Sequence, residues 1–133
     1  ELFGGPPTPA VGFGMGDVVL THVLRDKGLV GDDHLPQPDA FVIAAGEEHD
    51  DLAQAMVAEL RLAGLHARFS YKATRNVGKL LKEAAGSRSR HALIIESDGS
   101  LQLKDLDGGE QQPIDRRDVV SRVRDARQAR QSA

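Results

Sequence analysis

Apolar residues recur along the chain at spacings that distinguish strands from helices. Residues 41–45 form a short apolar run with the length of a buried strand, and residues 66–71 and 92–95 are interpreted as a second and a third strand. Four segments instead repeat apolar residues with the helical period: residues 18–24, 52–63, 77–85 and 119–123. Strand and helix patterns alternate through the middle of the chain, which favours an α/β fold.

The remaining turns and strands follow from local signals. Residues 101–104 alternate between apolar and polar and predict a half-buried strand. Asp107-Gly108-Gly109 is a hairpin turn into a short strand that ends near Ile114, and Asp115 can cap the last helix. Before these elements, Ala10–Met15 has glycines at alternate positions and is interpreted as a further strand.

The order of these elements predicts one architecture for residues 39–130, namely a mixed sheet of about five strands covered by three helices. Helical crossovers join the first three strands, so these should be parallel, and the hairpin should add antiparallel edge strands. Residues 29–38 contain two prolines and the adjacent acids Asp32 and Asp33, and are predicted to be a linker. Residues 1–28 then form a separate first segment.

Composition excludes several classes of protein. The chain has 133 residues and no cysteine, so disulfides and thiolate metal sites are ruled out. The five histidines show no ligand spacing, and no metal site is predicted. No apolar run approaches the roughly 18 residues of a membrane span. The first residues do not resemble a signal peptide, and a cytoplasmic location is expected.

Charge is strongly segregated in a chain whose net charge is only -3. Residues 61–91 carry eight basic side chains against Glu83, whereas residues 1–60 carry eleven acids against Arg25 and Lys27. Such a local positive field suits a polyanion. A solubilising surface is the alternative interpretation.

The candidate binding residues of the basic segment lie around the predicted helix at 77–85. Arg75, Lys79 and Lys82 fall within about 60° of one another on an ideal helix and predict a basic stripe facing solvent. Thr74 or Asn76 can cap this helix, whose first N–H groups would then suit a phosphate. Lys72 belongs to the preceding loop.

Two further features of the same region can contact RNA bases. Tyr71, the only tyrosine, is placed to stack on an unpaired base, or else simply packs at a strand end. Glu47 and Glu48 follow the first strand of the sheet, at the edge where ligands bind in open α/β sheets. Their carboxylates can accept hydrogen bonds from base edges, or can serve only as helix N-terminal charge.

The glycine-rich start offers a different candidate site. Gly12, Gly14 and Gly16 alternate along the chain and would let a flat ligand approach the backbone. Their GxGxG spacing is not the GxGxxG of dinucleotide-binding folds. No Walker motif and no GxSxG motif is present.

Several motifs together resemble the class II aminoacyl-tRNA synthetases, in the version found in histidyl-tRNA synthetases. Residues 4–16 (GGPPTPAVGFGMG) resemble motif 3 of that class. Three later segments agree with the family in order and spacing: ELRLAGL at 59–65, RNVGKLLK at 75–82, and LKDL at 103–106 followed by GEQ at 109–111. The likeness covers nearly the whole chain.

The resemblance implies a division of the chain into two parts. Residues 1–28 would be the end of a catalytic domain. Gly12, Gly14 and Gly16 would form the floor of its site for ATP and Mg²⁺. Residues 39–130 would be the anticodon-binding domain, which positions the tRNA for histidine attachment. Motifs for ATP and histidine expected upstream are absent, so a C-terminal fragment without catalytic activity of its own is expected. The full-length protein would be a homodimer.

One departure from the family keeps an alternative open. Val19 stands where motif 3 usually has an arginine that contacts ATP phosphates, and Val18 stands where glutamate is common. The chain can therefore also be a synthetase-like regulatory or accessory protein. A third interpretation is an anticodon domain from a sister synthetase for proline, threonine or glycine.

Overall fold

The computed structural model describes residues 4–31 and 35–131, so the linker acids Asp32 and Asp33 lie outside the described residues. The chain divides into two units, Glu1–Pro36 and Gln37–Ala133. The boundary between them falls within the predicted linker. Each unit is described by itself.

The described part of the first unit contains one helix, α1 (Asp17–Asp26), which confirms the helical pattern at residues 18–24. It ends as the sequence predicts, with Gly28 in the left-handed region at φ 65°. None of the α1 residues, all of which the structure describes, is buried. The strand predicted at Ala10–Met15 is wrong, because a strand needs a neighbour to pair with and these exposed residues have none among those described.

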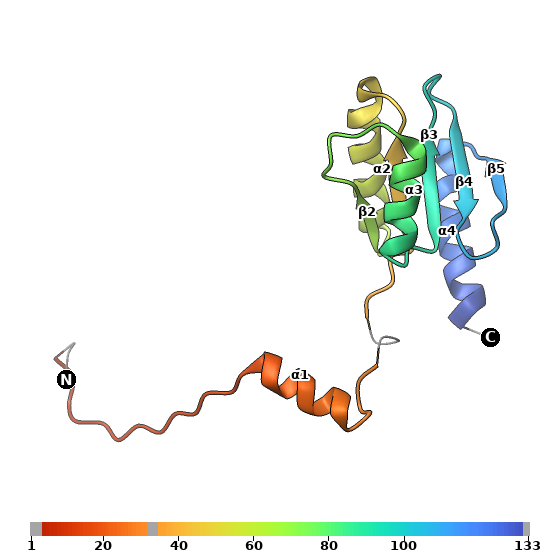
Figure 1. The fold of residues 1–133 in the computed structure, drawn as a ribbon. Helices are drawn as coiled ribbons and strands as arrows, with labels where there is room; N and C mark the ends of the chain where they lie inside the picture. The colour runs from red at the N-terminus through yellow and green to blue at the C-terminus, as the bar shows by residue number, and fades with distance from the viewer. Residues whose placement is uncertain (1–3, 32–34, 132–133) are drawn as a thin grey trace. The chain divides into compact units, whose positions relative to one another are not determined.

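The second unit is built on the predicted mixed sheet, whose five strands lie in the order β2-β1-β3-β4-β5 (Figure 1). The strands are β1 (Ala40–Ala44), β2 (Ala67–Phe69), β3 (His91–Ile95), β4 (Leu101–Asp105) and β5 (Gln111–Pro113). As predicted, β1 pairs in parallel with both β2 and β3, and β4 and β5 add antiparallel pairs.

The three predicted α-helices cover both faces of this sheet. Helices α2 (Asp50–Leu62) and α4 (Arg116–Gln131) pack on one face, where Val42 and Leu93 are buried. Helix α3 (Val77–Gly86) packs on the other, through Leu80 and Ala84 against Phe41. Figure 1 shows α3 on the near side of the sheet and α4 behind it. A short 3-10 helix, η2 (Glu47–His49), precedes α2.

The positions of α2 and α3 follow from the strand order. The chain runs from β1 through α2 to β2 on one side, and returns through α3 to β3 on the other side of β1. Each crossover between parallel strands is right-handed. Because the chain moves across the sheet in one direction through α2 and in the opposite direction through α3, the two helices lie on opposite faces. The segments that leave β1 and β2 therefore diverge, and the ends of these strands border a crevice.

A buried carboxylate joins the opposite ends of the strands. Asp39 is only 4% exposed and accepts a hydrogen bond from the His66 backbone N–H at 2.8 Å. Its carboxylate also lies 3.8 Å from Arg90 and 3.4 Å from Arg127 of α4. The side chain thus connects the starts of β1, β2 and β3 with α4, and burial is tolerated because both cations face it.

Replacing Asp39 by alanine should lower the free energy of unfolding by about 2 kcal/mol, because it leaves the covered His66 N–H without its acceptor and removes the negative charge that faces two guanidinium groups. Urea unfolding of the purified chain measures this. Asp125→Ala is the matched control, since Asp125 is exposed on α4, and it should change stability by less than about 0.5 kcal/mol. Equal effects of the two substitutions would contradict this role of Asp39.

Candidate functional site

The crevice at the ends of β1 and β2 is a cleft of about 300 Å³. Its floor includes Val42 and Ala44 of β1 together with Phe69 of β2. Its walls come from the start of α2 and from residues 70–75. We call residues 70–76 the connector, because they join β2 to α3. Three of the predicted binding residues, Tyr71, Lys72 and Arg75, line this cleft.

The aromatic side chain at the rim of the cleft is Tyr71, which is 87% exposed. Its ring centroid lies 4.9 Å from that of Phe69, with 49° between the ring planes. One edge of the ring is therefore supported by protein, while most of its surface faces solvent. An exposed, supported aromatic ring can stack on a planar ligand.

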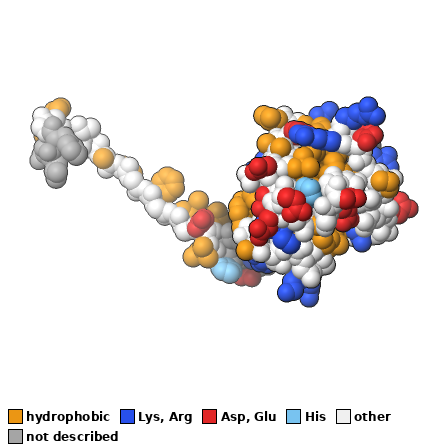
Figure 2. Space-filling model, turned by 90° about the horizontal axis from the view of Figure 1, so that it is seen from above, with side chains coloured by type: hydrophobic (Ala, Val, Ile, Leu, Met, Phe, Trp, Pro, Cys, Tyr) orange, Lys and Arg blue, Asp and Glu red, His pale blue; other side chains and the backbone are white. Residues whose placement is uncertain are grey.

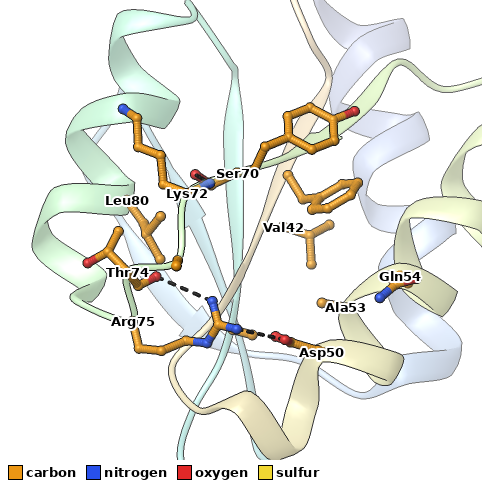
Figure 3. Close-up of a pocket in the computed structure, with 13 residues that line it drawn as sticks. Val42, Asp50, Ala53, Gln54, Ser70, Lys72, Thr74, Arg75 and Leu80 are labelled. Atoms are coloured by element: carbon orange, nitrogen blue, oxygen red, sulfur yellow. Dashed lines mark hydrogen bonds and ion pairs between the residues drawn. The ribbon is translucent and has the colours of Figure 1, made fainter.

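Arg75 does not belong to a basic stripe on α3, and this part of the prediction is wrong. The helix begins at Val77, so Arg75 lies before it. Its Nη2 donates to the Asp50 carboxylate at 2.6 Å, and its Nη1 lies 3.5 Å from the Thr74 carbonyl oxygen (Figure 3). Figure 3 shows the guanidinium reaching across to the start of α2, away from Lys72.

Lys72 is also paired with a carboxylate. Its Nζ lies 3.2 Å from Oε2 of Glu83 on α3, and the same Oε2 accepts a hydrogen bond from the Ser70 hydroxyl at 3.0 Å. The Lys72 side chain remains 70% exposed, so the ammonium still faces solvent. Two of the predicted cations are thus held by acids that lie on different helices.

Lys79 and Lys82 do face solvent from α3, as predicted, while Leu80 and Ala84 face the sheet. Neither lysine forms an ion pair with a described residue. Sequence reasoning missed a third cation here, Arg68, which is exposed on β2. It is paired in register with Phe41, whose side chain packs on the α3 face. Because neighbouring strands share the same face at paired positions, Arg68 points to the α3 face.

Asn76 confirms one of the two predicted caps. Its Oδ1 accepts a hydrogen bond from the Lys79 backbone N–H at 2.9 Å, and its φ and ψ are those of an N-cap residue. Thr74, the other predicted cap, does not cap α3. Its hydroxyl instead accepts a hydrogen bond from the backbone N–H of Asn76, the residue before the helix, at 3.3 Å. The Asn76 side chain is therefore committed to α3.

Glu47 and Glu48 lie in η2, exposed, at the end of the sheet where the parallel strands terminate. Figure 2 looks onto this end and shows acidic side chains around a histidine. The Glu48 carboxylate is 3.8 Å from His49, whose ring contacts the Ser97 carbonyl oxygen at 3.2 Å. Exposed acids repel phosphates, so this end does not suit an RNA backbone, although carboxylates can still accept from base edges.

An adjacent acid extends this negative region. Asp98 lies in the turn between β3 and β4, and its Oδ1 accepts from the Ser100 backbone N–H at 2.9 Å. Hydrogen bonds from Ser100, strongest from its side chain, hold the pKa of Asp98 below its ordinary value. The carboxylate is therefore charged at neutral pH.

Gly12, Gly14 and Gly16 lie in an extended, exposed segment that precedes α1. No described atom lies within 4 Å of where a Cβ of Gly12 or Gly14 would be, and Gly16 approaches only Val19. None of the three has a positive φ. The described residues around them form no cradle of hydrogen-bond donors for a nucleotide.

The fold and the cleft define an α/β module whose cleft lies at the carboxyl ends of parallel strands. Comparison with known proteins gives the family: the chain matches the anticodon binding domain over residues 39–126. The chain therefore belongs to the anticodon-binding domain family.

The most similar curated relatives include two histidine–tRNA ligases. That of Symbiobacterium thermophilum is 34% identical over 131 residues, covering 95% of this chain. That of Pyrococcus abyssi is 35% identical over 133 residues, covering 94% of this chain. The chain spans only 30% and 29% of their respective lengths.

Solved structures confirm the fold. The histidyl-tRNA synthetase of Nostoc sp. superimposes with a TM-score of 0.66 at 24% identity, covering 82% of this chain and 26% of that one. The RNA-binding domain of threonyl-tRNA synthetase from Cryptosporidium parvum gives a TM-score of 0.57 at 19% identity, covering 65% of this chain and 22% of that one.

Replacing Asn76 by alanine should cost about 1 kcal/mol of stability, because the Lys79 N–H is left without its acceptor at the start of α3. Asn76→Asp is the matched variant, since aspartate caps helices equally well and should preserve the free energy of unfolding. Urea denaturation followed by circular dichroism measures both. An equal loss in both variants would show that stability at Asn76 does not come from the cap.

Proposed function

We propose that this chain recognises the anticodon region of the tRNA for histidine, as part of a histidine–tRNA ligase. The observation that carries the proposal is that an anticodon-binding fold presents an exposed aromatic ring on the connector and, on the helix that follows it, two exposed lysines that form no ion pair with a described residue. Lys79 and Lys82 are available to phosphates, and Tyr71 is available to an unpaired base.

The physical basis is a difference between two surfaces of the second unit. The α3 face carries Arg68, Lys79 and Lys82 toward solvent, whereas the end bearing η2 is acidic. A phosphate backbone is attracted to the first surface and repelled by the second. The connector lies at the start of α3, beside the basic surface, so it would meet the bases of a loop whose backbone follows α3.

The roles of individual residues are proposed on this basis. Lys79, Lys82 and the exposed ammonium of Lys72 bind phosphates. Tyr71 stacks on a base of the anticodon loop. Glu47 and Glu48 accept hydrogen bonds from base edges at η2, which precedes α2. Arg75 and Asn76 act through the structure of the connector and of α3, because their polar groups are already engaged.

The activity of the whole protein is proposed from its relatives. The full-length protein is a ligase that attaches histidine to its tRNA with ATP and Mg²⁺, acts as a homodimer, and works in the cytoplasm. The chain alone is expected to be inactive. The glycine segment offers no nucleotide cradle among the described residues, so no catalytic step is assigned to it.

Among the described residues, no helix has the length and hydrophobicity needed to cross a membrane.

A synthetase-like accessory role is the second candidate, and Val19 is the observation that motivates it. The curated relatives described above are themselves histidine–tRNA ligases at 34% and 35% identity, which favours the ligase. An accessory protein would not need to distinguish one anticodon from another, so anticodon discrimination separates the two candidates.

The double variant Lys79→Ala/Lys82→Ala should weaken binding to the tRNA for histidine. The slope of the logarithm of the binding constant against the logarithm of the salt concentration should be shallower by roughly 0.7 to 0.9 for each phosphate that the variant no longer neutralises. Fluorescence-anisotropy titrations of labelled tRNA at several salt concentrations measure both quantities. Arg122→Ala is the control, because it removes a cation from α4 on the opposite face of the sheet.

The same titration with an anticodon-swapped tRNA should give affinity about tenfold or more weaker, because the base edges no longer match the protein while the phosphate backbone is unchanged. Equal affinity for both tRNAs would contradict anticodon recognition. A salt slope that is unchanged by the double variant, or changed as much by Arg122→Ala, would remove Lys79 and Lys82 from the interface.

A further inference from the structure

The backbone of the connector is not held by secondary structure. Within the part of the chain that the structure describes, no hydrogen bond between backbone groups involves residues 70–75. The preceding strand β2 is only three residues long and lies at the edge of the sheet. The path of the connector therefore depends on side chains.

Those side chains converge on two carboxylates from opposite faces of the sheet. At one end, Glu83 of α3 accepts from the Ser70 hydroxyl and pairs with Lys72. The Ser70 hydroxyl in turn accepts from the Lys72 backbone N–H at 3.1 Å. At the other end, Asp50 of α2 pairs with Arg75.

We infer that Asp50 and Glu83 are positioning residues that clamp the connector between α2 and α3, so that Tyr71 is presented to RNA in a fixed place. The inference deepens the proposed function and rests on it. Neither acid belongs to the set of RNA-binding residues predicted from the sequence.

The geometry at Asp50 supports a positioning role. The Arg75 side chain is 30% exposed, its Nε is covered without a hydrogen-bond partner among the described residues, and its Nη2 meets Asp50 at 2.6 Å. A guanidinium that is covered on one side and paired on the other is poorly placed to bind a phosphate. It is well placed to fix the end of the connector against α2.

The clamp leaves the recognition surface open. Between the two anchors, Tyr71 and Ala73 are exposed, and the Tyr71 ring touches Phe69 on the cleft floor. Binding by a disordered connector would require ordering its side chains at the moment of contact. A connector that is already ordered avoids this cost, which is why acids beside an RNA site can increase affinity.

Removing the Asp50 charge should change tRNA affinity in the direction opposite to that expected from long-range electrostatics alone. Asp50→Asn removes a negative charge and frees a cation near a polyanion, so long-range electrostatics alone would strengthen tRNA binding. Loss of the clamp would instead weaken it, by about threefold to tenfold, as expected for one or two side chains that must be ordered on binding.

The matched control is Asp51→Asn. Asp51 also lies in the first turn of α2 and is exposed, and it forms no ion pair with a described residue. Both substitutions make the same change in net charge and in the interaction with the α2 dipole. Asp50→Glu, which can still reach Arg75, should restore affinity.

Tyr71 provides a direct reporter of connector order, because the chain has one tyrosine and no tryptophan. The experiment measures time-resolved tyrosine anisotropy of the free protein, and tRNA affinity at moderate salt, for the wild type and the variants Asp50→Asn, Asp51→Asn, Asp50→Glu and Glu83→Gln. Faster local motion of Tyr71 and weaker binding are expected in Asp50→Asn and Glu83→Gln only, with an unchanged urea midpoint.

Unchanged Tyr71 motion in Asp50→Asn, or binding as tight as that of Asp51→Asn, would overturn the clamp. Failure of the wild type to bind tRNA would overturn the proposed function instead. In that case the anisotropy measurements still decide whether the two carboxylates order the connector, because they are made without RNA.

Discussion

The right-handed crossover of parallel strands is the constraint on which the rest of this structure depends. Strand β1 lies between β2 and β3, so the chain must travel outward through α2 and back through α3. Handedness places these helices on opposite faces and separates the segments that leave β1 and β2. The cleft, the connector and the exposed face of α3 all result from this one reversal of direction.

Burial in the centre of the sheet makes that arrangement rigid. Every residue of β1 and β3 is buried, with alternate side chains packed under α2 and α4 on one face and under α3 on the other. Residues 70–75 of the connector sit on this base without a backbone-to-backbone hydrogen bond among the described residues. The two carboxylate anchors of the connector, Asp50 and Glu83, lie on helices that pack against the core. These two side chains therefore link the packed core to the proposed RNA-binding surface.

The sequence predicted the elements well where periodicity was strong, and predicted the site only in part. The spacing of Leu80 and Ala84 correctly placed Lys79 and Lys82 on the outside of α3. It failed for Arg75, because Asn76 caps the helix after that residue. The acid that pairs with Arg75 lies 25 residues away in the sequence. No local pattern identifies such a partner.

Two other outcomes show the same limit of local patterns. Arg68 was not selected, because the face that a strand residue occupies depends on its register with Phe41, and register is a property of the assembled sheet. The glycine segment at Ala10–Met15 has the composition of a strand but no described partner strand. Sequence periodicity thus predicts which residues can be buried, whereas pairing across the fold decides which charges remain available to a ligand.

The most direct test of this account is an NMR titration of the isotope-labelled chain with an RNA hairpin that carries the anticodon stem and loop of the tRNA for histidine. The account predicts that backbone amide shifts concentrate in the connector and in α3, with smaller changes in η2 and little change along α4. Shift changes centred on α4 and on β4, against which it packs, would contradict it.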